Sequence, residues 1–110
     1  MVDVKKQFIA ELTPEAEQQL LQLEPKFRVR IAEAIKTFEY IGLHYKNLNT
    51  LKNGLYEIKP SGVRAYFMYD TKRRRIIIIG FICLKKTQKA PDQFMRQAIK
   101  NIEKYLKEVE

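Results

Sequence analysis

The side chains of this chain that could do chemistry are mostly cations. Lys and Arg number 21 against 13 Asp and Glu, which gives a formal net charge of +8 at pH 7. The most suggestive cation is Arg64, which stands between apolar Val63 and Ala65 in a strand-like segment. A guanidinium stays charged when it is partly buried, and it can grip a phosphate through two parallel hydrogen bonds. The alternative is a structural ion pair between Arg64 and Glu57 on the neighbouring predicted strand.

Two further groups of cations fall in predicted loops. Lys72–Arg75 places four cations in a row at a turn, while Lys85, Lys86 and Lys89 follow a long apolar segment. Either group could be only a solvated loop. Exposed cations nevertheless strengthen binding to a polyanion. The overall charge therefore predicts an acidic partner.

The other residue types that carry chemistry give weak signals. No His, Cys and Asp residues have the spacing of metal ligands, so neither a metal nor a cofactor is predicted. His44 is the only histidine, and it falls in a predicted loop, which makes it a weak candidate for a general base. Cys83 lies between Ile82 and Leu84 and is expected to be a small buried hydrophobe. Nucleophilic catalysis of the Ser/His/Asp or Cys/His type is therefore poorly supported.

Length and composition bound the class of protein. The 110 residues fit one domain, 1–110. Apolar residues make up 45% and charged residues 31%, which is ordinary for a globular domain and argues against disorder. The single cysteine excludes an intramolecular disulfide framework and favours a reducing compartment. No signal peptide is evident, and the longest apolar run, Ile76–Leu84, is too short to span a bilayer. We therefore expect a cytoplasmic protein that does not enter a membrane.

The first part of the chain predicts a strand followed by a helical hairpin. Gln7–Leu12 alternates in most positions, as a short strand does. Thr13 can cap a helix and Pro14 suits its first position. Pro25 separates this helix from a second one, in which apolar residues recur at helical spacing. Gly42 is placed to end the second helix.

The second part of the chain predicts a sheet and a final helix. Leu43–Asn53 is polar and reads as a loop. Leu55–Lys59 and Val63–Tyr69 are strand-like, and the continuous apolar run of Arg75–Leu84 is typical of a central strand buried on both faces. Pro91 opens the last helix. The order β-α-α-β-β-β-α predicts an α+β domain, in which an N-terminal strand and a helical hairpin pack on a small, mainly antiparallel sheet with a C-terminal helix.

Three motifs occur in a fixed order in this second part. Leu51–Lys59 reads LKNGLYEIK, Gly62–Phe67 reads GVRAYF, and Lys85–Pro91 reads KKTQKAP. With these motifs the chain resembles the RelE/ParE toxin superfamily, specifically the phage-derived HigB-like branch of type II toxin–antitoxin toxins. The resemblance runs from Phe8 to about Leu106, and the KKTQKAP segment is its most specific part. It implies the RelE-like fold, whose element order agrees with the order predicted from pattern.

The resemblance also implies a function. Ribosome-dependent members of the superfamily are mRNA endoribonucleases that inhibit translation, and a cognate antitoxin holds them inactive. In the HigB-like branch that antitoxin is usually a helix-turn-helix, HigA-like protein, so operator DNA would be reached only through the complex. The cleavage uses the ribose 2′-hydroxyl as nucleophile and needs cations, an acid and a base, but no metal. The alternatives are a non-catalytic inhibitor of a protein target, as in the ParE-like members directed against DNA gyrase, and a decayed, harmless member.

Four residues are the expected catalytic group. By the resemblance, Arg64 contacts the scissile phosphate, Lys86 matches a basic catalytic residue, and Lys59 matches a lysine near the 2′-hydroxyl. Glu57 stands where some relatives carry a second lysine, so it could act as the base or could only orient Arg64. The Arg64→Ala variant is expected to lose toxicity while keeping its fold.

The expected contacts to RNA and the ribosome are more numerous. They are Lys85, Lys89, Tyr66, Lys72, Arg73, Arg74 and Arg75. Tyr66 shares a strand face with Arg64 and could stack on a base, although a sheet aromatic packed under a helix is the alternative. RelE-like toxins can carry a base-stacking Tyr near the start of the last helix. Here Phe94 stands close to that position, and it is expected to be a core residue.

Overall fold

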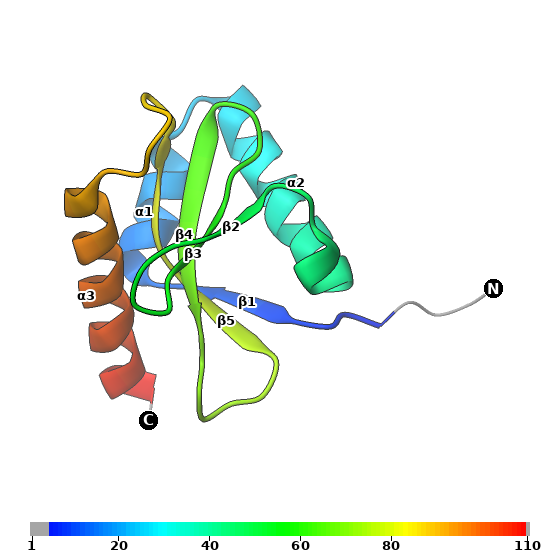
Figure 1. Cartoon of the computed structure of the whole chain (residues 1–110), viewed down its shortest axis with the longest axis vertical. Helices are drawn as coiled ribbons and strands as arrows, with labels where there is room; N and C mark the ends of the chain where they lie inside the picture. Colours follow the sequence, from blue (N-terminus) through cyan, green and yellow to red (C-terminus); the bar gives the residue numbers. More distant parts are fainter. Residues whose placement is uncertain (1–4, 110) are drawn as a thin grey trace.

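The computed structural model describes residues 5–109. They form a five-stranded sheet with helices on both of its faces (Figure 1). The elements are β1 (Ile9–Leu12), α1 (Pro14–Gln22), α2 (Pro25–Ile41), the short 3-10 helix η1 (Gly42–His44), β2 (Leu48–Thr50), β3 (Tyr56–Ile58), β4 (Val63–Tyr69), β5 (Ile76–Leu84) and α3 (Asp92–Val109). This arrangement confirms the predicted α+β class.

The predicted helical hairpin is confirmed at its boundaries. The Ala16 N–H donates to Thr13 Oγ1 over 3.1 Å, so Thr13 caps α1 as expected. Pro25 is the first residue of α2. Gly42 follows α2 with a φ of +58°, and a Cβ at this position would lie 2.8 Å from the Phe8 ring. A glycine is therefore required where the chain leaves the hairpin.

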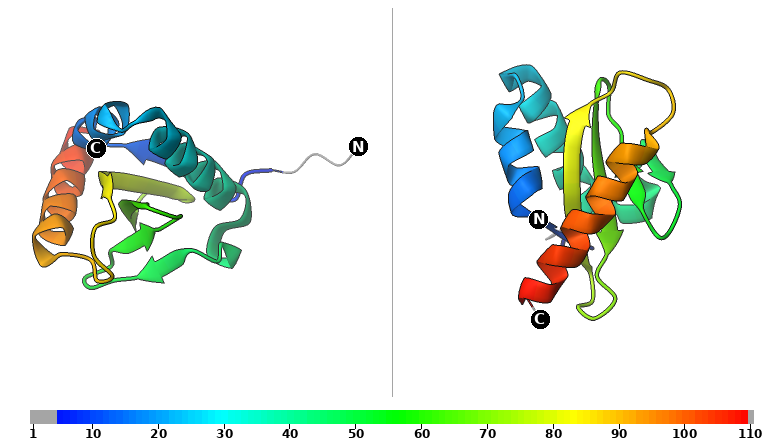
Figure 2. Two further views of the ribbon diagram at one scale, coloured as in Figure 1. Left: turned by 90° about the horizontal axis from the view of Figure 1, so that it is seen from above. Right: turned by 90° about the vertical axis from the view of Figure 1, so that its left-hand side faces the viewer.

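The strands are arranged in the order β1-β5-β4-β3-β2. β1 runs parallel to β5, and the other pairs are antiparallel. Figure 2 shows α1 and α2 on one face of the sheet and α3 on the other. Ile77, Ile78 and Ile79 in β5 are each at most 1% exposed, which confirms the prediction of a strand buried on both faces.

The hydrophobic core has two parts, one on each face of the sheet. The part under the helical hairpin contains Ala16, Ile31, Ala34, Ile35, Phe38, Ile58, Val63, Ala65, Phe67, Ile77, Ile79 and Ile82. The part under α3 contains Leu55, Tyr66, Ile78, Ala90, Met95, Ala98 and Ile102. Alternate residues of β4 therefore face opposite parts of the core, as strand geometry requires.

A bulge in β5 lets α3 lie close to the sheet. The pairing of β4 with β5 shifts by one residue between Tyr66 and Phe67, which leaves Gly80 as the extra residue. A Cβ on Gly80 would lie 2.6 Å from the Ala98 carbonyl oxygen. Asn101 Nδ2 donates to the Gly80 carbonyl oxygen over 2.9 Å. The glycine and this hydrogen bond together fix the position of α3 over β5.

The prediction that Leu43–Asn53 is a loop is wrong. Its first part forms η1, and Leu48–Thr50 forms the edge strand β2, which pairs with β3. Asn has a low strand propensity, so β2 depends on pairing with its neighbour rather than on its own sequence. The structure therefore has one strand more than the predicted order. Two predicted strands are also shorter than expected, since β1 begins at Ile9 and β3 spans Tyr56–Ile58.

Candidate functional site

Arg64 is buried in the middle of the candidate site. It belongs to β4 and is only 1% exposed. Its Nη2 atom donates to the carbonyl oxygens of Thr87 over 2.6 Å and of Gln88 over 2.9 Å, and its Nη1 donates to that of Lys89 over 3.3 Å. Three consecutive carbonyls of the loop between β5 and α3 thus surround one guanidinium. These hydrogen bonds hold the loop in place, because it has no regular structure to satisfy its own carbonyls.

Glu57 forms an ion pair with Arg64, which confirms the structural alternative considered for these two residues. The distance from Arg64 Nε to Glu57 Oε2 is 3.4 Å, and Glu57 is 3% exposed. Glu57 Oε1 accepts a hydrogen bond from Asn49 Nδ2 over 3.0 Å and lies 3.9 Å from Lys59 Nζ. The carboxylate is therefore paired with cations on two sides and accepts one hydrogen bond at Oε1, while its buried Oε2 has no hydrogen-bond partner among the described residues. Asn49 gave no signal in the sequence, because its segment does not read as a strand.

Tyr66 and Cys83 line the same face of the sheet beside this ion pair. Tyr66 lies opposite Glu57 in the pairing of β3 with β4, and Cys83 lies opposite Arg64 in the pairing of β4 with β5. Burial raises the pKa of Tyr66 well above its usual value. Burial likewise raises the pKa of Cys83 to about 11. Both side chains are therefore neutral at pH 7, and neither is placed to act as a base.

The structure makes Tyr66 a core residue. Its side chain is fully buried, and its ring centroid lies 6.0 Å from that of Phe81. No face of the ring is open for stacking on a base in this arrangement, which corresponds to the alternative of an aromatic packed under α3. Phe94 stacks on Phe81 with centroids 5.0 Å apart and packs against the core under α3, as predicted.

Four lysines lie at the end of the sheet that holds the buried ion pair, and one of them, Lys59, contacts it. The Lys59 side chain is 24% exposed and reaches from the solvent to Glu57. Lys85 Nζ lies 3.5 Å from Gln88 Oε1 in the same loop. Lys86 and Lys89 are exposed, and the charge of Lys86 acts on the Cys83 thiol. The structure thus gathers all four lysines of the candidate site at one end of the sheet.

The four cations of the turn between β4 and β5 lie elsewhere. Figure 1 places this turn at the end of the sheet opposite the loop that follows β5. Lys72 and Arg74 are exposed there. The predicted catalytic group and Lys72–Arg75 therefore belong to separate surfaces.

Two arginines of the turn form hydrogen bonds that connect it to other parts of the fold. Arg73 binds Glu11 with two hydrogen bonds of 2.9 and 3.1 Å and donates from Nε to Asp70 Oδ2 over 2.6 Å. Tyr105 also donates to Glu11, over 2.8 Å, so this network joins the turn to β1 and α3. Arg75 has a φ of +66° and donates to backbone carbonyls that precede β1. The guanidinium groups of Arg73 and Arg75 therefore already form hydrogen bonds within the protein.

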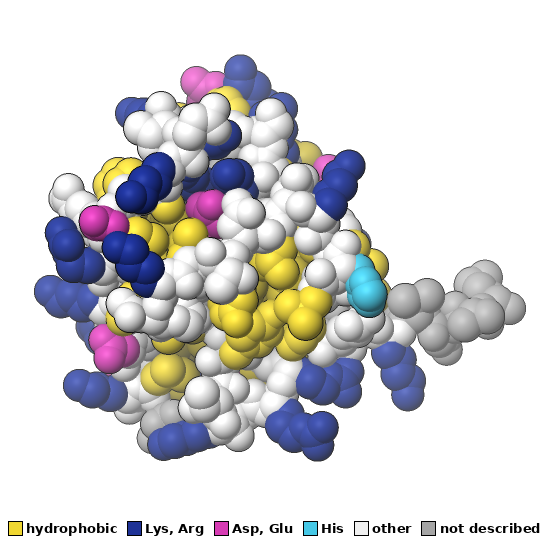
Figure 3. Space-filling model, viewed as in Figure 1, with side chains coloured by type: hydrophobic (Ala, Val, Ile, Leu, Met, Phe, Trp, Pro, Cys, Tyr) yellow, Lys and Arg dark blue, Asp and Glu magenta, His cyan; other side chains and the backbone are white. Residues whose placement is uncertain are grey.

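The surface seen in Figure 3 carries Lys and Arg side chains around its margin and an apolar area near its centre. Among residues 5–109, no group of three or more His, Cys, Asp and Glu side chains is placed to hold a metal ion. None of the helices in that range is long and apolar enough to cross a membrane.

Comparisons with known proteins give one family and one fold. Residues 18–103 match the family described as phage derived protein Gp49-like (DUF891). A chain in the solved structure of the toxin–antitoxin complex RelBE2 from Mycobacterium tuberculosis superposes with a TM-score of 0.60 at 16% sequence identity. The match covers 71% of the present chain and 98% of the other, and it confirms the RelE-like fold that the motifs imply. No match is found among curated proteins.

Proposed function

The chain belongs to the phage-derived Gp49-like family, and from this premise we propose that it is the toxin of a type II toxin–antitoxin system. The fold it shares with a chain of a toxin–antitoxin complex supports this proposal. Its proposed partner is a cognate antitoxin of the helix-turn-helix, HigA-like type, through which the complex reaches operator DNA. The proposed site of action is the cytoplasm.

We further propose that the toxin acts as a ribosome-dependent mRNA endoribonuclease. The observation that carries this proposal is that Lys59 contacts the buried Glu57, while Lys85, Lys86 and Lys89 belong to the loop whose carbonyls bind Arg64. The transition state of RNA cleavage concentrates negative charge on the phosphate, so a set of cations at one place can stabilise it. The ribosome would hold the message against this set.

The chemistry can be divided among the surface lysines. The ribose 2′-oxygen attacks the neighbouring phosphorus as its proton leaves, and the bond to the 5′-oxygen breaks as that oxygen takes up a proton. The Lys59 ammonium is partly exposed and lies 3.9 Å from Glu57 Oε1, which makes it the candidate to stabilise the negative charge that develops on the 2′-oxygen while the proton passes to water. Lys86 is exposed on the loop after β5 and is the candidate to act at the leaving oxygen.

Arg64 can contact a phosphate only by exchanging partners. Its Nη atoms are held by the carbonyls of Thr87, Gln88 and Lys89. A phosphate oxygen is a stronger acceptor than a neutral carbonyl, since the hydrogen bond to it is charge-assisted. In our proposal the substrate replaces these carbonyls on the guanidinium when the loop moves, and Glu57 keeps Arg64 oriented.

A non-catalytic inhibitor of a protein target, such as DNA gyrase, is the second candidate. The observation that favours it is the burial of Arg64 and Glu57, both at most 3% exposed. A surface that only binds a protein needs no group open to substrate. In that case the lysines would serve for docking.

The experiment that separates these functions uses a reconstituted translation system with a defined mRNA, with and without ribosomes. The proposal expects cleavage only where ribosomes hold the message. If the message stays intact in both arms while protein synthesis continues, the ribonuclease proposal is wrong, and a gyrase supercoiling assay then tests the second candidate.

A further inference from the structure

A continuous groove runs beside the lysine-rich end of the sheet. It lies between the N-terminal half of α3 and the loop that joins β2 to β3. Three adjoining pockets form it, since Lys52 and Met95 line both the first and the second, and Lys89 and Ala90 line both the second and the third. The first two have volumes of about 200 and 280 Å³. The groove shares Lys89 with the catalytic proposal, and its floor residues Ala90 and Met95 are the outer edge of the core under α3, but neither role explains the groove as a whole.

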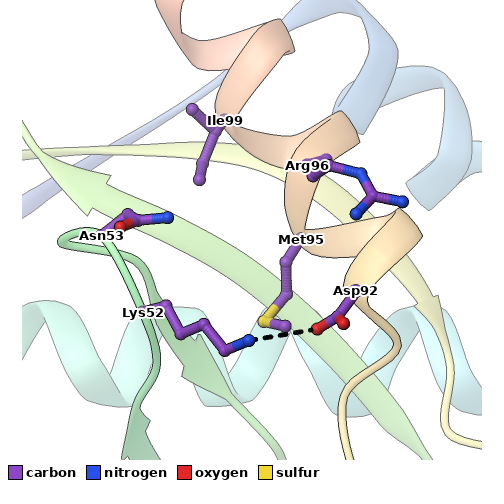
Figure 4. Close-up of a pocket in the computed structure, with 6 residues that line it drawn as sticks. All are labelled: Lys52, Asn53, Asp92, Met95, Arg96 and Ile99. Atoms are coloured by element: carbon purple, nitrogen blue, oxygen red, sulfur yellow. Dashed lines mark ion pairs between the residues drawn. The ribbon is translucent and has the colours of Figure 1, made fainter.

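The floor of the groove is aliphatic. Met95 and Ile99 come from α3, and Leu51 and Ala90 come from the two loops. Figure 4 shows Met95 and Ile99 pointing from α3 toward the loop that carries Lys52 and Asn53. Among the described residues that line the groove, none is aromatic. Stacking on a base, which dominates recognition of single-stranded RNA, therefore has no platform here.

The rim of the groove is positively charged. Lys52, Lys89 and Arg96 border it, against the single carboxylate of Asp92. Lys52 Nζ lies 3.6 Å from Asp92 Oδ1 in an exposed ion pair across the groove (Figure 4). An exposed pair of this kind contributes little stability, so a ligand carboxylate can replace it at small cost. The rim is thus suited to acidic side chains.

We propose that this groove docks an acidic segment of the partner antitoxin, with an aliphatic side chain seated on Met95 and carboxylates on Lys52 and Lys89. A methionine-containing aliphatic floor is typical of surfaces that bind protein segments. The identity of the partner rests on the function proposed above. The chemistry of the segment rests on the groove alone.

The position of the groove gives the docked segment a regulatory effect. Its third pocket is lined by Thr87 and Lys89, whose carbonyls bind Arg64. A segment seated there packs against the loop and holds these carbonyls on the guanidinium. Arg64 is then kept from the phosphate of a substrate.

The test measures binding of a fluorescein-labelled peptide of Glu and Leu to the full chain by fluorescence anisotropy at physiological salt. The test variant is Lys52→Glu/Arg96→Glu. The matched control is Lys100→Glu/Lys107→Glu, which changes the net charge equally on another part of α3. The test variant is expected to raise the dissociation constant of the peptide about tenfold or more, the usual scale for losing an interface anchor. The control variant is expected to bind the peptide as the unchanged protein does.

A second peptide, with every Leu replaced by Ser, tests the aliphatic floor and is expected to bind more weakly. Equal weakening by both charge variants, or equal binding of both peptides, would show non-specific attraction and overturn the proposal. A single-stranded RNA oligonucleotide is measured in parallel. If the Lys52→Glu/Arg96→Glu variant loses RNA binding and keeps peptide binding, the groove is a nucleic-acid site instead. No ribosome is present in this test, so its failure leaves the outcome of the translation experiment unaffected.

Discussion

Arg64 Nη2 donates to the Thr87 carbonyl oxygen over 2.6 Å, although 23 positions separate the two residues in the chain. This hydrogen bond ties the middle of β4 to the loop that carries the lysines of the candidate site. Arg64 also neutralises Glu57 on β3. The buried Arg64 side chain therefore holds the loop in place and also neutralises the Glu57 carboxylate.

The first prediction concerns the stability of Arg64 variants. Arg64→Met should destabilise the fold by about 3–5 kcal/mol, because it leaves the Glu57 carboxylate buried without its partner. This prediction differs from the expectation from the sequence that removing Arg64 leaves the fold intact, because Arg64 is buried and paired with Glu57. Urea unfolding measures the free energy of unfolding directly.

A double variant separates the lost charge from the lost packing. Arg64→Met/Glu57→Gln removes both charges, so it should recover much of the stability that Arg64→Met loses. Arg74→Ala is the surface control and should change the free energy of unfolding by no more than about 0.5 kcal/mol. If the double variant is less stable than Arg64→Met, the ion pair is not the cause.

The second prediction concerns the pH dependence of stability. Burial alone would raise the pKa of Asp70, but hydrogen bonds from the Arg73 side chain and from the Lys72 and Arg73 amides hold it below its usual value of 3.8. Asp70 therefore stabilises the fold above that value, and this contribution is lost as the pH falls through the lower pKa of the folded state. Unfolding curves at a series of acidic pH values measure it.

The Asp70→Asn variant provides the control. It should be less stable than the unchanged protein near neutral pH, and the difference should shrink as the solution becomes more acidic. A difference that stays constant down to the lowest pH would show that the Asp70 charge contributes nothing.

The third prediction concerns the bulge in β5. Gly80→Ala should destabilise the protein by about 1–3 kcal/mol, the usual cost of overpacking, because the new Cβ would meet the Ala98 carbonyl oxygen at 2.6 Å. Thermal unfolding measures the loss. Gly54→Ala is a useful comparison, since its φ of +78° strains the backbone while its Cβ meets only a methionine methyl at 3.6 Å. A loss at Gly80 of no more than about 0.5 kcal/mol, the usual range for an uncrowded position, would show that contact with α3 does not require a glycine there.

Periodicity and capping predict most of this fold. The caps at Thr13 and Gly42 and the apolar run of β5 are local signals, and each element that they predict is present. β2 is not predictable in this way, because its three residues become a strand only by pairing with β3. The bulge at Gly80 cannot be predicted from the sequence either, since it depends on how closely α3 approaches the sheet.

The residues of the candidate site can be predicted from the sequence, but most of the contacts that they make cannot. The sequence places Glu57 and Arg64 on neighbouring strands, and their ion pair forms. The sequence does not show that the carbonyls of the loop after β5 accept hydrogen bonds from Arg64, because contacts between a strand and a distant loop leave no periodic signal. Arg73 reads as one of four solvated cations in a row, yet its partners Glu11 and Asp70 make it structural.

The last prediction assigns the cleavage chemistry to Lys86 within the proposed function. Lys86 is exposed, so Lys86→Ala should leave the free energy of unfolding within about 0.5 kcal/mol of the unchanged protein. If the ammonium acts on the developing charge, the rate of ribosome-dependent cleavage should fall by about a hundredfold or more, as when one preorganised donor is removed. Lys36→Ala, an exposed site on α2, should cleave normally. Single-turnover cleavage on programmed ribosomes measures the chemical step, and a Lys86→Ala rate equal to that of Lys36→Ala would remove Lys86 from the mechanism.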